Sequence, residues 1–219
     1  MYNDKDKDYF KSIRKNLLDL IPVNNKNGIV LEVGAASGDN LIYAKNNGYA
    51  KSIHGIELIE IKDSSQSSTE FNSFQIGDIE KMKIEFEKQF FDVIILGDVL
   101  EHLIDPWKTV QDLQGYLKLN GVFVVSMPNI RHYSIFKSIF LNGDFRYKDS
   151  GILDKTHLRF FTKKNIINLF TSKHLKIIKI EDNLSTERNK IKILNALTFG
   201  IFRGLLISQY FLVVNKNEN

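Results

Sequence analysis

The sequence of 219 residues contains no cysteine. This absence excludes disulfide bonds, thiolate zinc sites and a cysteine nucleophile, and it suits a reducing, cytoplasmic setting. Internal repeats and low-complexity linkers are also lacking. We therefore expect a single domain over residues 1–219.

Long uninterrupted hydrophobic runs are absent as well. The most apolar segment, Ile193–Val214, contains Arg203, Gln209 and two glycines, so we expect no helix that spans a membrane. Contact with a membrane surface is the alternative for this segment, through Phe199, Ile201, Phe202, Leu205 and Leu206. Residues 1–8 alternate acids and bases and lack the apolar core of a signal peptide, which again favours the cytoplasm.

Positive charge is concentrated in the later part of the chain. Residues 131–192 carry 14 Lys and Arg against 6 Asp and Glu, whereas the net charge of the whole chain is +4. This excess indicates either a solvated basic face or an anionic acceptor such as a nucleotide-sugar, a phosphoglycan or RNA. No RNA-binding module is recognisable, so RNA is not the favoured partner, and DNA is not expected.

Strand-like and helix-like segments alternate along the chain, which predicts an α/β fold: a doubly wound, mostly parallel sheet of seven strands. The expected strands are Ile29–Val33, Ser52–Glu57, Ser73–Ile76, Phe91–Leu96, Val122–Met127, Lys176–Glu181 and Gln209–Asn215. The expected helices are Tyr9–Ile21, Gly38–Asn47, Glu60–Ser68, Pro106–Leu117 and Thr162 to about His174. Asn120 and Gly121 are predicted to form the turn before the fifth strand.

The run from Ile29 to Gly38 reads IVLEVGAASG, an apolar strand followed by a turn of small residues between two glycines. Small residues let a ligand approach the backbone, and a helix that begins at Gly38 would direct unpaired N–H groups toward it. The spacing E-x-G-x-x-x-G resembles motif I of class I S-adenosylmethionine-dependent methyltransferases, with Ala36 in place of the usual middle glycine. A buried strand and turn without a cofactor is the alternative reading.

Acidic residues then end successive predicted strands, in the order that the same family shows. The resemblance implies a Rossmann-like fold and S-adenosylmethionine as cofactor. It assigns Glu32, Gly34 and Gly38 to the methionine moiety and the turn, Glu57 to the ribose, and Asp78 with Ile79 to the adenine. The complete set expected to bind the cofactor is Glu32, Gly34, Ala35, Gly38, Glu57, Leu58, Gly77, Asp78, Ile79, Gly97 and Asp98.

Two further stretches carry groups that could act on the acceptor. If residues 98–102 form a helical turn, Asp98, Glu101 and His102 share one face, and His157 follows far downstream. These four residues could hold a divalent cation, Mn²⁺ or Mg²⁺, although mixed oxygen and nitrogen ligands suit Mn²⁺ better. Alternatively, His102 or His157 is a metal-free general base that Glu101 assists. A third reading gives these groups only structural hydrogen bonds.

Residues 151–162, GILDKTHLRFFT, resemble a segment of bacterial methyltransferases of glycan and sugar biosynthesis. The D-x-x-E-H layout followed by a distant histidine also resembles the metal-binding set of small-RNA 2′-O-methyltransferases and of quinone-ring O-methyltransferases, in which Glu is usual at the position of Asp98. Residues 130–161, rich in aromatic and basic side chains, are expected to form a lid-like insertion after the fifth strand.

We therefore expect an enzyme that transfers a methyl group from S-adenosylmethionine to a hydroxyl of a sugar, either in a nucleotide-sugar or in a glycan. The alternatives are an RNA 2′-O-methyltransferase, a quinone or small-molecule O-methyltransferase, and a non-catalytic scaffold of the same fold. The chain is compatible with an oligomer, and fold alone does not fix the substrate.

Overall fold

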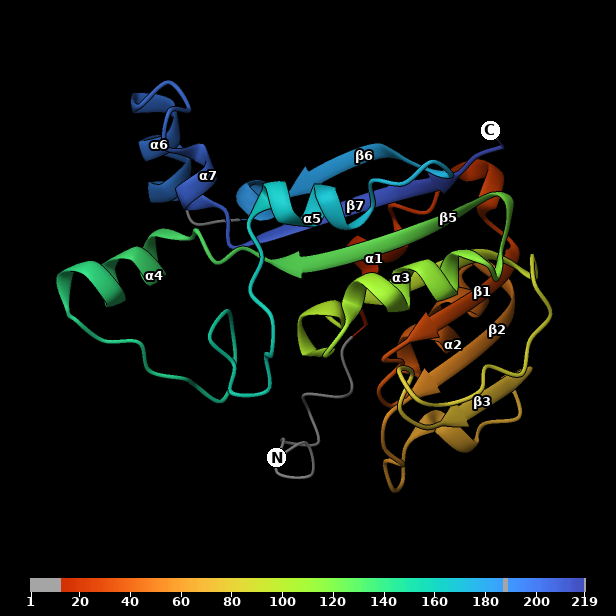
Figure 1. Cartoon of the computed structure of the whole chain (residues 1–219). Helices are drawn as coiled ribbons and strands as arrows, with labels where there is room; N and C mark the ends of the chain where they lie inside the picture. Colours follow the sequence, from red (N-terminus) through yellow and green to blue (C-terminus); the bar gives the residue numbers. More distant parts are fainter. Residues whose placement is uncertain (1–12, 187–188, 219) are drawn as a thin grey trace.

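The computed structural model describes residues 13–186 and 189–218. Its centre is one seven-stranded sheet in the order β3-β2-β1-β4-β5-β7-β6 (Figure 1). The strands are β1 (Gly28–Val33), β2 (Ala50–Glu57), β3 (Ser73–Ile76), β4 (Phe91–Gly97), β5 (Leu117–Pro128), β6 (Leu175–Asp182) and β7 (Gln209–Lys216). Only β7 runs antiparallel to its neighbours, β5 and β6. The predicted doubly wound, mostly parallel fold is confirmed.

The sheet separates two hydrophobic cores, because successive side chains of a strand point to opposite faces. In β4, Ile94 and Leu96 belong to one core, and Val93 and Ile95 belong to the other. Both sets are fully buried. The near-continuous apolar sequence of the central strands follows from this burial on both faces.

Helices cover the two faces. The α-helices are α1 (Lys15–Leu18), α2 (Asp39–Asn46), α3 (Pro106–Gln114), α4 (Tyr133–Phe136), α5 (Lys163–Leu169), α6 (Asn189–Leu197) and α7 (Arg203–Leu206). Residues of α1 and α2 pack in one core, and residues of α3 and α5 pack in the other. Short helical turns are η3 (Val23–Asn25), η4 (Ser65–Ser67), η5 (Leu100–His102), η6 (Lys137–Leu141, a π-helix) and η7 (Asn183–Thr186).

Local sequence explains where two of the covering helices begin. The Asp105 side chain accepts a hydrogen bond from the Lys108 N–H at 2.9 Å, and Pro106 occupies the first turn of α3. Thr162 and Asn165 form a capping box at the start of α5. These caps satisfy N–H groups that the helix itself leaves without partners.

Five predicted elements differ from the structure. The helix expected over Pro106–Leu117 ends at Gln114, and Leu117 is the first residue of β5, which begins before the expected start at Val122. The helix expected over Glu60–Ser68 is reduced to η4, because this serine-rich segment favours local turns over helix. The leading helix is only α1, and residues 9–12 of its expected range lie outside the described residues. The helix that begins after Thr162 ends at Leu169, before His174. Asn120 has the positive φ of a turn, +61°, yet lies within β5 rather than before it.

Two segments project beyond the sheet on one side. Figure 1 shows α4 and the chain after it extending past the end of β5, and α6 with α7 standing beyond the start of β7. In the part of the chain that the structure describes, no helix has the length and apolar character needed to cross a membrane.

Candidate cofactor cavity and acceptor site

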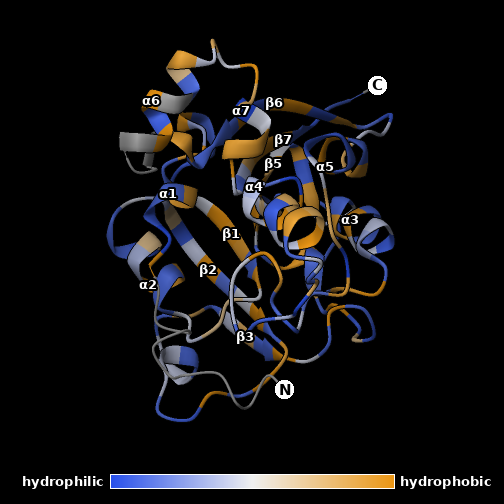
Figure 2. Ribbon diagram, turned by 90° about the vertical axis from the view of Figure 1, so that its left-hand side faces the viewer, coloured by the Kyte–Doolittle hydropathy of each residue, from blue (hydrophilic) through white to orange (hydrophobic). Residues whose placement is uncertain are grey.

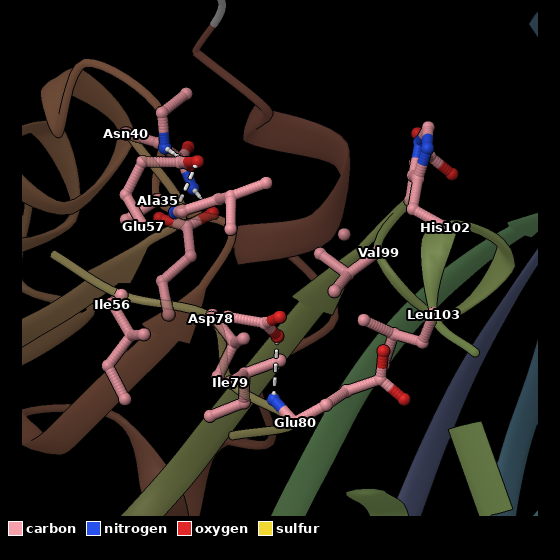
Figure 3. A pocket seen from close by; sticks show the side chains of 18 of the residues that line it. Ala35, Asn40, Ile56, Glu57, Asp78, Ile79, Glu80, Val99, His102 and Leu103 are labelled. Carbon is pink, nitrogen blue, oxygen red and sulfur yellow. Dashed lines mark hydrogen bonds between the residues drawn. The ribbon is translucent and has the colours of Figure 1, made fainter. Parts of the chain in front are cut away.

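A cavity of about 660 Å³ opens at the carboxyl ends of β1, β2 and β4. This is where open α/β sheets bind ligands, and the volume suits a small organic molecule. The residues that surround it are Arg14, Glu32, Val33, Gly34, Ala35, Ala36, Asn40, Ile56, Glu57, Leu58, Gly77, Asp78, Ile79, Glu80, Gly97, Asp98, Val99, His102, Leu103, Ile104 and Leu158. Figure 3 shows Asn40 and Glu57 on one side of the cavity and His102 on the other.

The turn after β1 has the strained backbone that its small residues predict. Gly34, Ala36 and Gly38 have φ of +71°, +48° and +87°. A Cβ atom at Gly34 would lie 2.6 Å from Val99 Cγ2, and one at Gly38 would lie 2.7 Å from Phe71 Cζ. Ala36 therefore keeps the left-handed conformation that a glycine would adopt at lower cost.

Gly38 does not border the cavity, although the sequence placed it among the cofactor-binding residues. It is the N-cap of α2, and a Cβ added to it would meet the Phe71 and Phe74 rings. The structure thus gives Gly38 a backbone role at the start of α2. The other ten residues of the expected set, from Glu32 to Asp98, all border the cavity.

Glu57 joins the end of β2 to the turn after β1. Its Oε2 accepts a hydrogen bond from the Ala36 N–H at 2.8 Å, and its Oε1 accepts one from the Leu58 N–H at 2.7 Å. Burial raises the pKa of this carboxyl, and the backbone N–H groups of Ala36 and Leu58 act in the opposite direction. Glu57 therefore holds the glycine turn in place as well as bordering the cavity.

Glu32 carries a buried carboxylate oxygen, Oε2, that has no hydrogen-bond partner within residues 13–186 and 189–218. Its other oxygen accepts a hydrogen bond from Asn40 Nδ2 at 2.8 Å. Burial raises the pKa of Glu32 to about 7, and the hydrogen bond from Asn40 opposes that shift. An acceptor in this position favours a ligand that brings a hydrogen-bond donor or a positive charge.

Asp78 lies across the cavity at the end of β3, next to Gly77 and Ile79. Its Oδ1 accepts from the Glu80 N–H at 3.0 Å (Figure 3), and its Oδ2 accepts from Lys81 Nζ at 2.7 Å. The Lys81 hydrogen bond lowers the pKa of Asp78, which keeps this carboxyl ionised. A charged acceptor beside the apolar Ile79 suits a ring with an exocyclic amino group.

Asp98, at the end of β4, is tied to three distant residues. Its carboxylate forms an ion pair with Arg14 and accepts hydrogen bonds from Ser126 Oγ at 2.8 Å and Gln209 Nε2 at 2.7 Å. Asp98 also has φ of +54°. The described residues do not place it with the other expected metal ligands, and these bonds account for its orientation.

The remaining expected ligands do come together. Glu101, His102 and His157 each offer one ligand atom, and these atoms lie within 4.8 Å of one another. The His102 and His157 ring centroids are 4.7 Å apart, and His157 Nε2 lies 4.0 Å from Glu101 Oε1. The backbone brings them together, because the Leu158 and Arg159 N–H groups donate to the Glu101 carbonyl at 2.8 and 2.9 Å.

The tautomers of both histidines follow from their carbonyl partners. His102 Nδ1 lies 3.1 Å from the Thr156 carbonyl, and His157 Nδ1 lies 3.0 Å from the Ile152 carbonyl. A carbonyl only accepts, so each Nδ1 carries a proton, and the neutral form of either ring has its lone pair on Nε2. Burial lowers the pKa of His102 to about 4, so its ring is neutral at neutral pH.

Glu101 is the most unusual group of this cluster. Its side chain is 1% exposed, and neither carboxylate oxygen has a hydrogen-bond partner among the residues that the structure describes. Burial raises its pKa well above the ordinary value. A carboxyl in this setting requires either a proton or a nearby cation. Only His102 of the three borders the cavity, and Glu101 and His157 lie behind it.

The sequence did not single out Arg14 or Asn40, which both border the cavity. The Arg14 backbone N–H donates to Asn40 Oδ1 at 2.9 Å, and its guanidinium reaches Asp98 and Ser126. No local pattern marks Arg14, because its partners lie on other elements. Asn40 could have been found from its position in the first turn of the helix after the glycines.

A sequence profile described as a methyltransferase domain matches residues 6–180. The match spans well over half of the chain. The chain belongs to this methyltransferase family. Such a family implies S-adenosylmethionine as cofactor. The acidic residues and the glycine turn around the cavity fit a ligand that carries hydrogen-bond donors and a positive charge. No curated protein matches the methyltransferase.

Solved structures with the same fold agree with this assignment. An S-adenosylmethionine-dependent methyltransferase from Mesorhizobium loti is 13% identical, with a TM-score of 0.63 over 94% of this chain and 98% of the other. A chain of the complex between the Haloferax volcanii Trm112 methyltransferase activator and a methyltransferase is 14% identical, with a TM-score of 0.65 over 97% and 92%.

The [4+2]-cyclase SpnF is 16% identical, with a TM-score of 0.64 over 93% of this chain and 80% of that protein. At these identities the likeness shows the fold alone. Because the same fold is found in a cyclase, the reaction of the methyltransferase has to be argued from its own residues.

Proposed function

We propose that this protein transfers a methyl group from S-adenosylmethionine to a hydroxyl of a sugar, in a nucleotide-sugar or a glycan. When bound, S-adenosylmethionine supplies an electrophilic methyl group on its sulfonium sulfur. The observation that carries the proposal is His102, a neutral imidazole on the wall of the cavity, opposite the residues that suit the cofactor (Figure 3).

A sugar hydroxyl is a weak nucleophile until its proton is removed. His102 is oriented for this step, because its Nδ1 donates to the Thr156 carbonyl and its Nε2 keeps the lone pair. With S-adenosylmethionine bound, His102 Nε2 would accept the hydroxyl proton while the hydroxyl oxygen takes the methyl group, the bond from sulfur to that methyl breaks and S-adenosylhomocysteine leaves. Glu101 and His157, which lie behind His102, pack against its ring and position it. The Thr156 carbonyl and the carboxylates of Asp98 and Asp154 favour the positive charge that the ring acquires, whereas His157 opposes it.

In a second version of the mechanism, Glu101, His102 and His157 bind a divalent cation such as Mn²⁺ or Mg²⁺, which activates the hydroxyl in place of a general base. The buried Glu101 carboxylate without hydrogen-bond partners and two imidazole Nε2 atoms form a mixed donor set. A cation held there would lower the pKa of a bound hydroxyl. Asp98 is not part of this set in our proposal, because Arg14, Ser126 and Gln209 engage its carboxylate.

Two features support a sugar acceptor. Leu158 borders the cavity, so the segment 151–162, which resembles those of sugar methyltransferases, contributes to the acceptor side. The exposed basic side chains of Arg131, Arg146 and Arg159 suit the phosphates of a nucleotide-sugar. An RNA 2′-hydroxyl is the second candidate, favoured only by the same basic excess, and RNA would make activity depend steeply on salt.

The test is a methyl-transfer screen with labelled S-adenosylmethionine against nucleotide-sugars, glycans, quinols and short RNAs, with and without EDTA. We expect transfer to a sugar hydroxyl. His102→Gln should lower kcat by about a hundredfold or more while the Kd for S-adenosylmethionine stays unchanged. His174→Gln, which changes an exposed histidine away from the cavity, is the matched control.

Transfer only to RNA or to a nitrogen acceptor would contradict the sugar proposal. Activity that survives EDTA at the wild-type rate would exclude the cation version and leave His102 as the base. A His102→Gln variant with full kcat would remove His102 from the mechanism in both versions.

A further inference from the structure

Large apolar side chains project into solvent on the side of the molecule where α4 and α6 extend. The first group, in α4 and η6, contains Phe136, Phe140 and Leu141, and Phe140 and Leu141 are each 70% exposed. The second group, at the end of α6 and the turn after it, contains Leu197, Phe199 and Ile201, and Phe199 is 93% exposed. We call these six residues the apolar tips.

The apolar tips lie on one side of the sheet. Asn129, which precedes α4, donates from Nδ2 to the carbonyls of Gly204 and Ile207, which belong to α7 and the residue after it. Figures 1 and 2 agree on this placement, because α4, α6 and α7 extend beyond the sheet in Figure 1 and face the viewer in Figure 2. Single exposed apolar residues are common, but large ones gathered on one side mark an interaction surface.

Both the backbone conformation and the solvent exposure of Phe199 are unfavourable. Its φ is +50°, a left-handed conformation that is unfavourable for a bulky side chain, and its ring is almost fully in water. Within the described residues, neither core packing nor backbone preference accounts for a phenylalanine here. Such a residue is consistent with a binding role, because strained and exposed apolar groups are kept where they contact a ligand.

Positive charge accompanies the apolar tips. Arg131, Lys137 and Lys192 are exposed, and Asp144 is the only acidic residue within residues 130–148 and 189–206. Aromatic and aliphatic side chains flanked by Lys and Arg are typical of segments that lie in the interface of an anionic membrane. We propose that the apolar tips dock this protein onto the surface of an anionic lipid bilayer, without crossing it.

The position of the surface gives the docking a consequence. The segment that carries the first group leaves the sheet at the carboxyl end of β5, and the cavity lies at the carboxyl ends of the parallel strands β1, β2 and β4. Docking through the apolar tips would hold the carboxyl ends of these strands, and the cavity there, near the lipid surface. The inference does not depend on which hydroxyl is methylated.

The test is co-sedimentation of the full chain with vesicles of phosphatidylcholine alone and of phosphatidylcholine mixed with phosphatidylglycerol, without cofactor or acceptor. We expect binding to the anionic vesicles that weakens as salt is added. The double variant Phe140→Ser, Phe199→Asn should bind them at least about tenfold more weakly. Its melting temperature should not fall, since both side chains are exposed and Asn tolerates a positive φ.

Matched controls exist at the amino ends of the parallel strands, opposite the ends where the cavity opens. Val23, before β1, is 82% exposed, so Val23→Asn removes a comparable apolar side chain without touching the tips. Lys137→Glu combined with Lys192→Glu should weaken binding at least about tenfold, whereas Lys51→Glu at the start of β2 should leave it unchanged.

Equal binding by the wild type and the Phe140→Ser, Phe199→Asn variant would overturn the inference, as would equal losses from the Val23→Asn control. A wild-type dimer in sedimentation velocity that becomes a monomer in this variant, with no binding to either vesicle, would show instead that the apolar tips join two copies of the chain. Methyl transfer to a soluble acceptor is measured separately, so failure of one proposal does not imply failure of the other.

Discussion

The carboxylate of Glu57 illustrates how much one residue contributes to the cavity. Glu57→Gln should raise the Kd for S-adenosylmethionine at least about tenfold, because the substitution replaces one of the two carboxylate oxygens that hold the turn at the cavity wall. Calorimetry measures this affinity directly. Glu60→Gln, three residues further along and exposed, is the control, and equal affinities in both variants would contradict the role of Glu57.

Alanine substitutions at two glycines with positive φ distinguish the energetic cost of backbone strain from that of steric overlap. Gly38→Ala adds a Cβ that meets Phe71. At Gly48, with φ of +76°, an added Cβ would have no described residue within 4 Å other than its chain neighbours. We expect Gly48→Ala to lower the free energy of unfolding by about 1 kcal/mol, from backbone strain alone. Gly38→Ala should cost about 1 to 3 kcal/mol more, from overpacking. Urea unfolding measures both values, and equal losses would contradict the steric role of Phe71.

His54 gives the protein a predicted dependence on pH. It is buried in β2 between Ser52 and Ser73 and against three phenylalanine rings, and burial lowers its pKa from 6.5 to about 4. The unfolded chain therefore binds the proton more tightly than the folded protein. The stability contributed by neutral His54 is complete above pH 6.5 and is lost as the pH falls toward 4.

Over this range we expect His54 to account for a loss of up to about 3 kcal/mol. Urea unfolding at several pH values tests this against His54→Gln, which keeps hydrogen-bonding groups but cannot be protonated. The decline toward acid should be shallower in the variant. Parallel pH profiles for the two proteins would show that His54 does not titrate in this range.

At the scale of the secondary-structure element, α5 depends on its capping box. Thr162→Ala removes the side-chain oxygen that accepts from the Asn165 N–H and should lower the free energy of unfolding by about 1 kcal/mol. Thr162→Ser keeps the hydroxyl and should cost much less. Thermal or urea unfolding distinguishes the two substitutions, and an equal loss would assign the effect to the Thr162 methyl group instead of the cap.

The strands were predicted within a few residues because their pattern is local. Buried central strands such as β4 require apolar residues on both faces, so the nearly continuous apolar run Phe91–Leu96 is recognisable as a strand from the sequence. Short helical turns were predicted less well. The Glu60–Ser68 segment is long enough for a helix but rich in serine. The Ser64 side chain accepts a hydrogen bond from the Gln66 N–H, and this local bond favours the short turn η4 over a helix.

For the whole molecule, cofactor binding and stability are linked. A ligand that binds only the folded state stabilises it by about 2.7 kcal/mol at a hundredfold excess over Kd. For a chain of this length that corresponds to a rise in Tm of roughly 5 to 10 °C. A thermal-shift titration with S-adenosylmethionine and S-adenosylhomocysteine measures it, and an unchanged Tm at saturating concentrations would contradict cofactor binding in this cavity.

The sequence by itself determined the alternation of strands and helices, the glycine turn after β1 and the acidic residues at the strand ends, because each depends on neighbouring residues or on a short period. Ten of the eleven expected cofactor residues border the cavity for this reason. Their roles toward S-adenosylmethionine remain a prediction.

The tertiary structure alone decided which distant side chains meet. It paired Asp98 with Arg14 and Gln209, which removes Asp98 from the expected metal set, and it left only His102 of the other three expected ligands on the wall of the cavity. These contacts join residues far apart in the chain. No local pattern encodes such a contact, because it exists only when packing of the sheet and its insertion brings the two segments together.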